Sequence, residues 1–537
     1  MTIEERVQGL SLEDLAGQVL CYEVYDHDDP ARIENVFKNM RPGGVFLSKM
    51  PVEKIKMYAD MANKYAKIPV IISSDVETGP ECMIEGTGRL PYPMSWGASD
   101  SPELVEEAGR LTGAICRKNG IHWTYAPVVD INYNFQNPES NIRSVSESPK
   151  QVVKIMKAYM KGLQTNGYVA ATIKHFPGQG MDVRNSHFCT TINNQTKEEW
   201  METYGYVYKE MIKAGAPSIM IGHGALPCYE EENDPFFGPP PAVLSKSMMT
   251  DLLKGELGFD GCLVSDAMSM IGVASRVDNM EDVAVKYLLA GGDMILFPEP
   301  NDYANIIAAV KSGKLPLERL KDAVIRILRL KESVRLFEDQ EKVNEEIGET
   351  GTVDEVAQAI ADKAIKVVRN VKEVLPVQMP KGSRVLMLNM FEPHFHKPAT
   401  GNEFEPMRKA FEERGYIVDE IHTAQYDEVQ KIMDNYELIC LNCKMGPADY
   451  HGASMRLGWN NIMVLWRGYV LHHKRVVFTS FGDPYKLFDM PYLKEYINAF
   501  SNDAATQRAV VKVILGEIEP QGKNPVSLEG FFQREVE

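Results

Sequence analysis

The sequence predicts an α/β protein in which a (β/α)8 barrel of the TIM type is followed by a three-layer α/β/α sandwich domain. Two observations predict the barrel: short apolar runs recur along the first 335 residues, and a helical pattern follows most of them. The runs are continuous rather than alternating, as expected for parallel strands buried on both faces. The eight runs are 18–21, 44–47, 69–72, 123–126, 170–173, 218–221, 262–264 and 294–296.

Capping residues mark the helices between these runs. Thr196 begins one helix with Glu199 three residues later, which is the spacing of a capping box, and Gly215 ends it. Ser101 and Ser148 each precede a proline, a common start of a helix. Eight strand–helix units over about 250 residues or more are typical of a (β/α)8 barrel. An open doubly wound sheet is the alternative, and the lack of a phosphate-binding glycine motif disfavours it.

A second α/β region follows the barrel. A long helix ends the barrel region, and the polar, proline-free residues after it suit a linker. Further apolar runs with helical patterns between them predict an open sheet covered by helices. We therefore place the barrel at residues 1–337, the linker at 338–352 and the sandwich at 353–537. The four runs of the sandwich are 384–388, 438–441, 462–465 and 476–478.

The composition predicts a cytoplasmic globular protein without nucleic-acid or membrane partners. Its 58 Lys and Arg against 75 Asp and Glu give a net charge of −17, so the basic footprint of a nucleic-acid binder is missing. The first residues lack the features of a secretory signal, and no run reaches 18 apolar residues. The eight scattered cysteines suit buried thiols in a reducing compartment. The oligomeric state does not follow from these features.

Polar and charged residues follow nearly every apolar run of the barrel. In a barrel these positions form the rim where function lies. Carboxylates accept hydrogen bonds, and Lys, Arg and His donate them, so such a rim suits a neutral, hydroxyl-rich ligand. A phosphate ester would require a glycine-rich cradle and more cations, although the single arginine can hold one anion. These residues include Asp75, Glu77, Asp130, Arg143, Lys174, His175, Asn185, His187, His223, Asp266 and Glu299.

The histidines do not predict a metal site. His122, His175, His187 and His223 are not joined by the HxxxH or HxH spacing that favours zinc. Residues 394–396 spell HxH, but they lie in the second domain without a third ligand nearby, so we interpret them as a solvated loop. We expect neither a metal nor a cofactor.

Several blocks of sequence match one known family in the same order along the chain. In the barrel they are SDVETG at 74–79, PVVDIN at 127–132, NPESNIRS at 137–144, KHFPGQG…NSH at 174–187, IKAGAPSIMIGH at 212–223 and SDAMSM at 265–270. They resemble glycoside hydrolase family 3, in particular its β-N-acetylglucosaminidase branch. The blocks AIKVVRNVKEVLPV at 364–377 and GEIEPQGKNPVSL at 516–528 resemble the α/β sandwich of that family. The resemblance therefore spans both predicted domains.

The resemblance implies a retaining exo-glycosidase that hydrolyses terminal N-acetyl-β-D-glucosaminides of small oligosaccharides or glycosides by double displacement. It makes Asp266 the nucleophile that forms a glycosyl-Asp intermediate. It makes His187, on the loop after the fifth run, the acid/base, a task that suits imidazole because it titrates near neutrality. The resemblance implies substrate binding by Asp75, Asp130, Arg143, Lys174, His175 and His223.

One departure from the family pattern concerns the acid/base. Asn185 stands two residues before His187, where the family has an aspartate that holds the imidazole. An amide can orient the ring, but it does not stabilise an imidazolium by charge, so a weaker base is expected. Asp182, three residues upstream of Asn185, is the alternative partner for the ring. Gln179 replaces a further histidine of the family.

Three alternatives to an N-acetylglucosaminidase remain open. With an altered acid/base loop, phosphate rather than water would resolve the intermediate, which would make the protein a phosphorylase. A diverged member would bind sugar without turnover. A β-glucosidase of the same family would take its acid/base from a glutamate of the second domain and would have tryptophan after the nucleophile, whereas Ala267 follows Asp266 here.

Overall fold

The chain divides into two compact units. The computed structural model describes residues 2–231, 233–391, 401–422, 426–446, 456 and 462–537. Contacts within the chain assign the residues up to 89, 106–130 and 156–353 to unit 1, and 90–105, 131–155 and 354–537 to unit 2. The domain boundaries predicted from the sequence stay a prediction.

Unit 1 is built on parallel strands whose side chains are almost all buried. They form one sheet in the order β4-β3-β2-β1-β8 and another in the order β5-β6-β7. Single parallel bridges join Trp123 to Ala170 and Val264 to Met294, and thus lie between the two sheets. Each predicted run of the barrel overlaps one of these strands. The strands are β1 (Leu20–Val24), β2 (Gly44–Leu47), β3 (Ile71–Ser74), β4 (Trp123–Thr124), β5 (Thr172–Phe176), β6 (Ser218–Ile221), β7 (Cys262–Ser265) and β8 (Ile295–Leu296).

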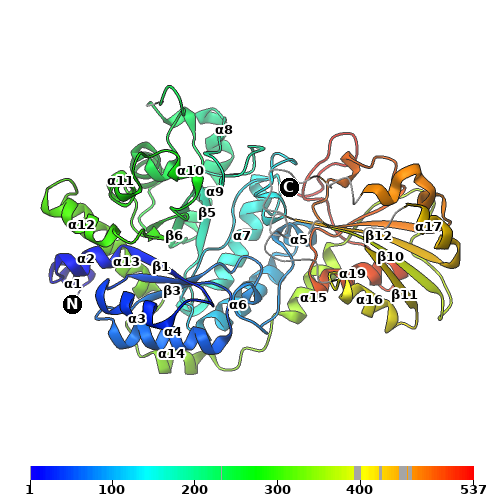
Figure 1. The fold of residues 1–537 in the computed structure, drawn as a ribbon, viewed down its shortest axis with the longest axis horizontal. Helices are drawn as coiled ribbons and strands as arrows, with labels where there is room; N and C mark the ends of the chain where they lie inside the picture. Colours follow the sequence, from blue (N-terminus) through cyan, green and yellow to red (C-terminus); the bar gives the residue numbers. More distant parts are fainter. Residues whose placement is uncertain (1, 232, 392–400, 423–425, 447–455, 457–461) are drawn as a thin grey trace. The chain divides into compact units, whose positions relative to one another are not determined.

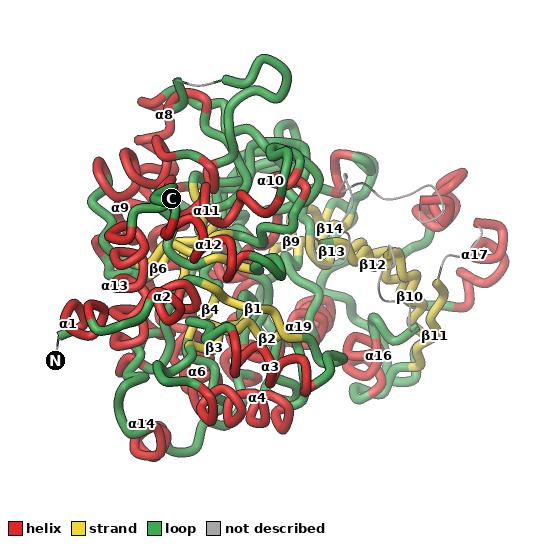
Figure 2. Tube along the Cα trace, turned by 60° about the vertical axis from the view of Figure 1, so that its left-hand side comes forward, coloured by secondary structure: helices red, strands yellow, loops and turns green. Residues whose placement is uncertain are grey.

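Helices lie around the strands of unit 1, as Figures 1 and 2 show for α3, α4, α6, α9 and α13. The main helices of this part of the chain are α1 (Ile3–Gln8), α2 (Leu12–Gln18), α3 (Pro30–Asn39), α4 (Val52–Tyr65), α6 (Pro102–Lys118), α7 (Pro149–Leu163), α8 (Lys197–Glu202), α9 (Tyr204–Lys213), α10 (Ile271–Ala274), α11 (Val283–Ala290), α12 (Asp302–Lys311), α13 (Leu317–Ser333) and α14 (Gln340–Ile347), with the π-helix η6 at Ser247–Glu256. Helix α14 lies within the predicted linker, where Asp339 caps its first turn.

One predicted helix is two helices in the structure. The capping box of Thr196 and Glu199 is confirmed, because each backbone N–H donates to the side chain of the other. The helix stops at Thr203, whose hydroxyl donates to the carbonyl of Glu199 at 2.7 Å. A threonine hydroxyl that bonds to the preceding turn competes with the helix backbone, and here the chain breaks between α8 and α9.

Unit 2 has a six-stranded sheet in the order β11-β10-β12-β13-β14-β9, in which only β9 is antiparallel to its neighbour. Figures 1 and 2 show α16 and α19 on one face of this sheet and α17 on the other. The strands are β9 (Lys366–Asn370), β10 (Arg384–Phe391), β11 (Ile417–His422), β12 (Leu438–Met445), β13 (Val476–Gly482) and β14 (Glu495–Asn498), and the helices include α5 (Pro93–Ser99), α15 (Asp354–Ala364), α16 (Glu405–Glu412), α17 (Tyr426–Ile432) and α19 (Ala504–Leu515).

The predicted strand at 462–465 is wrong. These residues lie at the start of the 3-10 helix η9 (Met463–His472). A short apolar run has no periodicity that distinguishes a buried strand from a buried helical segment. Tertiary packing determines which of the two forms. None of the helices within the described residues is long and apolar enough to cross a bilayer.

Candidate active site

The predicted site residues of unit 1 follow the carboxyl ends of neighbouring strands. Ile221 pairs with Ser265 in parallel register, so the chain leaves β6 and β7 at the same edge of the sheet. The backbone N–H of Asp266 still donates to the carbonyl of Ile221, at 2.8 Å. Unit 1 holds the following members of the predicted set: Asp75, Asp130, Lys174, His175, Asn185, His187, His223 and Asp266.

Lys174 joins two carboxylates at the end of β3. Its Nζ lies 2.9 Å from Oδ1 of Asp75 and 2.6 Å from Oε1 of Glu77, and its side chain is 4% exposed. A buried ammonium held by two carboxylates is fixed in position. Glu77 is one of the polar residues that follow the third run, but it was not assigned a binding role from the sequence; its ion pair with Lys174 brings it into the site.

Asp130 anchors the loop that begins at the end of β5. Its Oδ2 accepts a hydrogen bond from Nδ1 of His175 at 2.7 Å, and its side chain is fully buried. Its Oδ1 accepts from the backbone N–H groups of His175 at 3.2 Å and Gln179 at 2.8 Å. Asp130 therefore fixes both the imidazole of His175 and the course of the following loop.

Asp266 is held as a carboxylate. Burial favours its neutral form, but the nearby His223, His175 and Lys174 and the backbone N–H of Ala267 outweigh burial, and its pKa lies below the usual 3.8. The Ala267 N–H donates to Oδ1 at 2.8 Å. The carbonyl of Ala267 accepts a hydrogen bond from Nε2 of His223 at 2.9 Å, which ties the end of β6 to the residue after Asp266. An ionised, oriented carboxylate is the form that acts as a nucleophile.

His187 is exposed, and its ring is held by an amide. Oδ1 of Asn185 lies 2.6 Å from Nδ1 of His187 and also accepts from the His187 backbone N–H at 3.0 Å. Asp182, the alternative partner considered from the sequence, pairs with Arg184 at 2.5 Å and accepts from the backbone of Ile192 at 2.8 Å. The neutral Asn185 is therefore one of the groups that orient this imidazole.

A glycine allows the short helix α10 to pack directly on this loop. A Cβ atom on Gly272 would lie 2.5 Å from the carbonyl oxygen of Ser186 and 3.0 Å from Cβ of His223. The Ile271 N–H donates to the carbonyl of His187 at 3.3 Å, and the Thr190 hydroxyl donates to the carbonyl of Gly272 at 2.8 Å. Helix α10 therefore supports both the His187 loop and His223, a role that no motif in the sequence indicates.

Two further predictions concern residues outside this group. Arg143 belongs to unit 2, in the turn η2 (Asn141–Arg143), where one of its guanidinium nitrogens donates to the Glu139 carbonyl at 3.2 Å. Its role in binding stays a prediction. The HxH at 394–396 lies outside the described residues. Within the described residues, no group of three potential ligands is placed to hold a metal ion.

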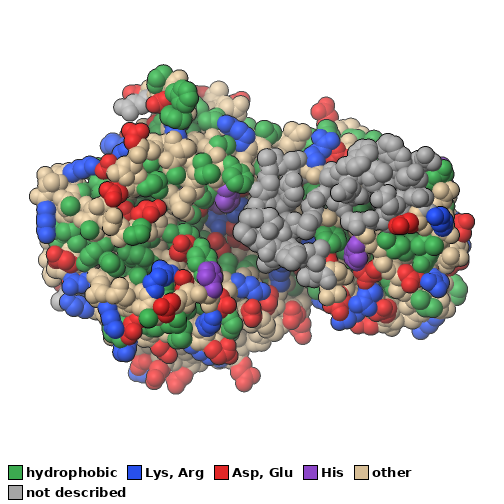
Figure 3. Space-filling model, viewed as in Figure 1, with side chains coloured by type: hydrophobic (Ala, Val, Ile, Leu, Met, Phe, Trp, Pro, Cys, Tyr) green, Lys and Arg blue, Asp and Glu red, His purple; other side chains and the backbone are tan. Residues whose placement is uncertain are grey.

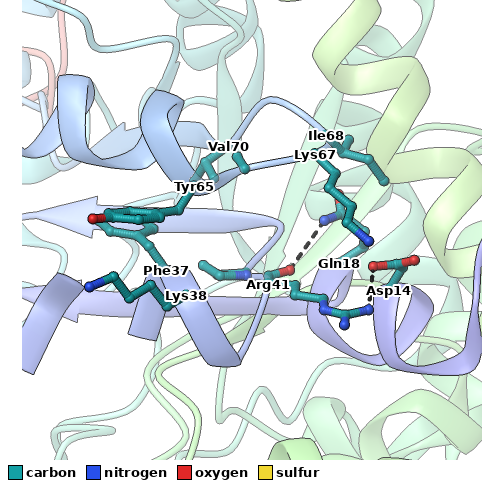
Figure 4. A pocket seen from close by; sticks show the side chains of 11 residues that line it. Asp14, Gln18, Phe37, Lys38, Arg41, Tyr65, Lys67, Ile68 and Val70 are labelled. Atoms are coloured by element: carbon teal, nitrogen blue, oxygen red, sulfur yellow. Dashed lines mark hydrogen bonds and ion pairs between the residues drawn. The ribbon is translucent and has the colours of Figure 1, made fainter. Parts of the chain in front are cut away.

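A pocket of unit 1 lies at the other ends of the strands (Figure 4). Gln18, Arg41 and Val70, which line it, precede β1, β2 and β3, whereas the predicted site residues follow strands. Its basic side chains have a structural explanation, because α2, α3 and α4 end there and cations favour helix C-termini. Among the side chains drawn in Figure 3, acidic and basic groups are interspersed, so the charge of −17 is not gathered in one patch on that face.

Comparisons with known proteins extend over both units. The family model "Glycosyl hydrolase family 3 N terminal domain" matches residues 3–330. A β-N-acetylglucosaminidase/β-glucosidase of Cellulomonas fimi is 28% identical over 531 residues, which cover 96% of this chain and 93% of the relative. A β-hexosaminidase of Stenotrophomonas maltophilia (strain R551-3) is 31% identical over 260 residues, which cover 46% of this chain and 72% of the relative.

Solved structures with the same fold cover nearly the whole chain. The β-glucoside phosphorylase BglX bound to 2FGlc matches with a TM-score of 0.87 at 27% identity, over 98% of this chain and 96% of that one. A family 3 β-N-acetylglucosaminidase from Paenibacillus sp. str. FPU-7 matches with a TM-score of 0.83 at 23% identity, over 97% of this chain and 99% of that one.

An α/β chain that carries carboxylates and imidazoles at the carboxyl edge of parallel strands, and that has these relatives, is a glycoside-cleaving enzyme. It belongs to glycosyl hydrolase family 3, and the resemblance noted in the sequence is confirmed.

Proposed function

We propose that the strands of unit 1 close into a (β/α)8 barrel and that unit 2 is a three-layer α/β/α sandwich. The bridges Trp123–Ala170 and Val264–Met294 support closure, because they join the ends of the two sheets of unit 1. Helices on both faces of the six-stranded sheet support the sandwich. In such a barrel the candidate site lies at the catalytic rim.

We propose that the enzyme is a retaining β-glycosidase that releases terminal N-acetyl-β-D-glucosamine. The observation that carries this proposal is the ionised Asp266, held by the Ala267 N–H among His223, His175 and Lys174. A carboxylate at this place is suited to attack an anomeric carbon and to form a glycosyl ester. The names of the Cellulomonas fimi and Stenotrophomonas maltophilia relatives support the N-acetylglucosaminide as substrate.

The reaction proceeds in two displacements. In the first, an oxygen of Asp266 forms a bond to C1, the bond from C1 to the leaving oxygen breaks, and His187 gives its proton to that oxygen. In the second, His187 takes a proton from water, the water oxygen bonds to C1, and Asp266 is released as a carboxylate. Two inversions at C1 return the β configuration.

The charged groups around the nucleophile are assigned to binding the sugar. Lys174, fixed by Asp75 and Glu77, donates to hydroxyl groups, and the two carboxylates accept from them. His175 is oriented through Nδ1 by Asp130. These groups exchange hydrogen bonds with hydroxyls at little cost in reorganisation, because their positions are already set before the sugar binds.

A specific observation favours phosphate as the second acceptor. The amide of Asn185, at the position where the family has a carboxylate, contacts Nδ1 of His187 and adds no charge to stabilise the protonated ring. Phosphate is already anionic and needs less activation, and no carboxylate at position 185 repels it. BglX, which covers nearly the whole chain, is a phosphorylase. Attack of a phosphate oxygen on C1 would release Asp266 and give a sugar 1-phosphate.

One assay separates these functions. An aryl N-acetyl-β-glucosaminide and the matching β-glucoside are each incubated with and without inorganic phosphate, and the products are followed by ³¹P and ¹H NMR. Free sugar of initial β configuration and a rate independent of phosphate support the hydrolase. Faster turnover with phosphate and a sugar 1-phosphate product support the phosphorylase. No turnover of either glycoside would support the third alternative, in which the protein binds sugar but does not catalyse a reaction.

A further inference from the structure

Two large apolar side chains stand in solvent beside the proposed acid/base. Phe188, the residue after His187, is 54% exposed, and Ile271 at the start of α10 is 51% exposed. The Ile271 N–H bonds to the His187 carbonyl at 3.3 Å, so the backbones that carry these two side chains are in direct contact. Exposed apolar side chains on segments that meet beside a catalytic group mark a binding surface.

The position of this pair relative to His187 indicates which part of the substrate it meets. On the proposed mechanism, His187 protonates the oxygen of the leaving group, so the group attached to that oxygen lies next to His187. Phe188 and Ile271 are joined to His187 by a peptide bond and by a hydrogen bond. The aglycone rather than the cleaved sugar is therefore the part that reaches them.

The surface that the pair presents is apolar, because the polar backbone around it is used within the loop. The Phe188 N–H donates to the Asn185 carbonyl at 3.0 Å, and the Ile271 N–H donates to that of His187. The carbonyl of Gly272 accepts from Thr190 at 2.8 Å. A sugar as leaving group would require hydrogen-bonding partners, whereas an aromatic ring requires only a flat apolar contact.

We propose that Phe188 and Ile271 form the binding surface for the leaving group and that the enzyme prefers β-glycosides with an aromatic aglycone. The inference rests on the proposed function, because it requires cleavage of a glycoside with His187 beside the leaving oxygen. It adds to that function the class of aglycone and the residues that select it.

The test compares leaving groups within each variant. Initial rates are measured with a glycosyl fluoride, whose leaving group reaches neither side chain, with a 4-methylumbelliferyl glycoside and with a disaccharide of the same sugar. The ratio of kcat/KM for the aryl glycoside to kcat/KM for the fluoride reports contact with the aglycone, since kcat/KM covers the steps up to the first displacement. The disaccharide reports the same contact for a polar leaving group.

In Phe188→Ala and Ile271→Ala, the aryl-to-fluoride ratio is expected to fall about tenfold. Each variant loses one apolar contact with the aromatic ring of the leaving group and the area that this contact buries. Phe188→Trp retains the ratio, because an aromatic face remains. Phe236→Ala is the matched control: Phe236 is 84% exposed in the loop after β6, where its backbone N–H donates to Asp234 and its ring contacts Phe237. Its aryl-to-fluoride ratio is expected to equal that of the wild type.

The outcomes separate this inference from the proposed function. Failure of the wild type to turn over the fluoride overturns the proposed function. Turnover of the fluoride with an unchanged aryl-to-fluoride ratio in both alanine variants overturns only the aglycone assignment. An equal fall for the disaccharide also overturns it, because the surface would then not select aromatic groups.

Discussion

The amide oxygen of Asn185 lies 2.6 Å from Nδ1 of His187, and it also accepts the backbone N–H of the same histidine at 3.0 Å. An Asn185 Oδ1 atom that accepts from Nδ1–H sets the tautomer of the ring, and on the proposed mechanism Nε2 is the atom that exchanges protons. The amide thus orients the imidazole as a carboxylate would, but it adds no charge to stabilise the protonated ring.

Asn185→Asp is therefore expected to strengthen His187 as a base. The new carboxylate stabilises imidazolium, so the rate of hydrolysis without phosphate should rise several-fold and the basic limb of the pH–rate profile should move to higher pH. Asn279→Asp, which adds the same charge at an exposed position, is the control. A pH profile identical to that of the wild type would count against His187 as the acid/base.

The nucleophile can be tested by replacing its side chain and supplying another anion. Asp266→Gly is expected to lower kcat for an aryl glycoside by about ten-thousandfold, as for loss of a covalent catalyst. Azide should restore turnover, because it fits where the carboxylate was, attacks C1 and displaces the aryl alcohol in a single step. The product is then a glycosyl azide of inverted configuration, identified by ¹H NMR. Lack of rescue together with normal sugar binding would point to a different nucleophile.

Gly272→Ala probes the contact of α10 with the loop. The added Cβ would lie 2.5 Å from the Ser186 carbonyl, so either α10 or the loop that carries His187 must move. A displacement of about 1 Å near a catalytic group lowers kcat/KM by up to about a hundredfold. The control is Gly9→Ala, where the Cβ would lie 3.6 Å from its nearest neighbour and φ is an ordinary −86°. Equal kcat/KM in both variants would show that the contact between Gly272 and Ser186 does not determine the position of the His187 loop.

Asp302 at the start of α12 makes stability depend on pH. Burial, together with the charges of Glu299 and Glu281, raises its pKa from 3.8 to about 6, although the Glu299 N–H bonds to it. The unfolded chain loses this proton at lower pH than the folded chain. The free energy of unfolding therefore falls as pH rises from about 4 to 6 and stays lower above that range.

Asp302→Asn removes this dependence and keeps an oxygen for the Glu299 N–H. It is expected to raise the free energy of unfolding by about 2 kcal/mol at pH 7.5 and to have little effect at pH 4. Thermal melting curves of the two proteins at both pH values provide the measurement. Equal melting temperatures at pH 7.5 would show that the charge of Asp302 does not destabilise the folded state.

The elements that sequence patterns predict best are those buried on both faces. The runs 44–47 and 218–221 coincide with β2 and β6, since every position of those strands is buried and three of the four residues in each are large and apolar. Strand β11 was missed because its residues, Ile417–His422, are half-buried and include charged side chains. The error at 462–465 has the opposite origin, since that run is apolar but helical.

For the site, the sequence indicates which side chains carry charge at strand ends, and their grouping follows from parallel strands. The pairs Lys174–Asp75 and His175–Asp130 are of this kind. The approach of Gly272 to Ser186 is not, because residues far apart in the chain meet there and no local pattern marks the contact. Glu77 is intermediate between the predictable and the unpredictable contacts. Its position after a strand is visible in the sequence, but its ion pair with Lys174 is not.

The pairing of β1 with β8 has a consequence for synthesis on the ribosome. Leu20 emerges early, but its partner in β8, Ile295, is added only after all the predicted catalytic side chains have been made. Strand β1 cannot pair with β8 until the last strand of unit 1 has been synthesised, and pairings between residues so distant in sequence form slowly. Catalysis should therefore begin only after the segment with Ile295 has left the exit tunnel, and nascent chains arrested before it should be inactive although they contain Asp266.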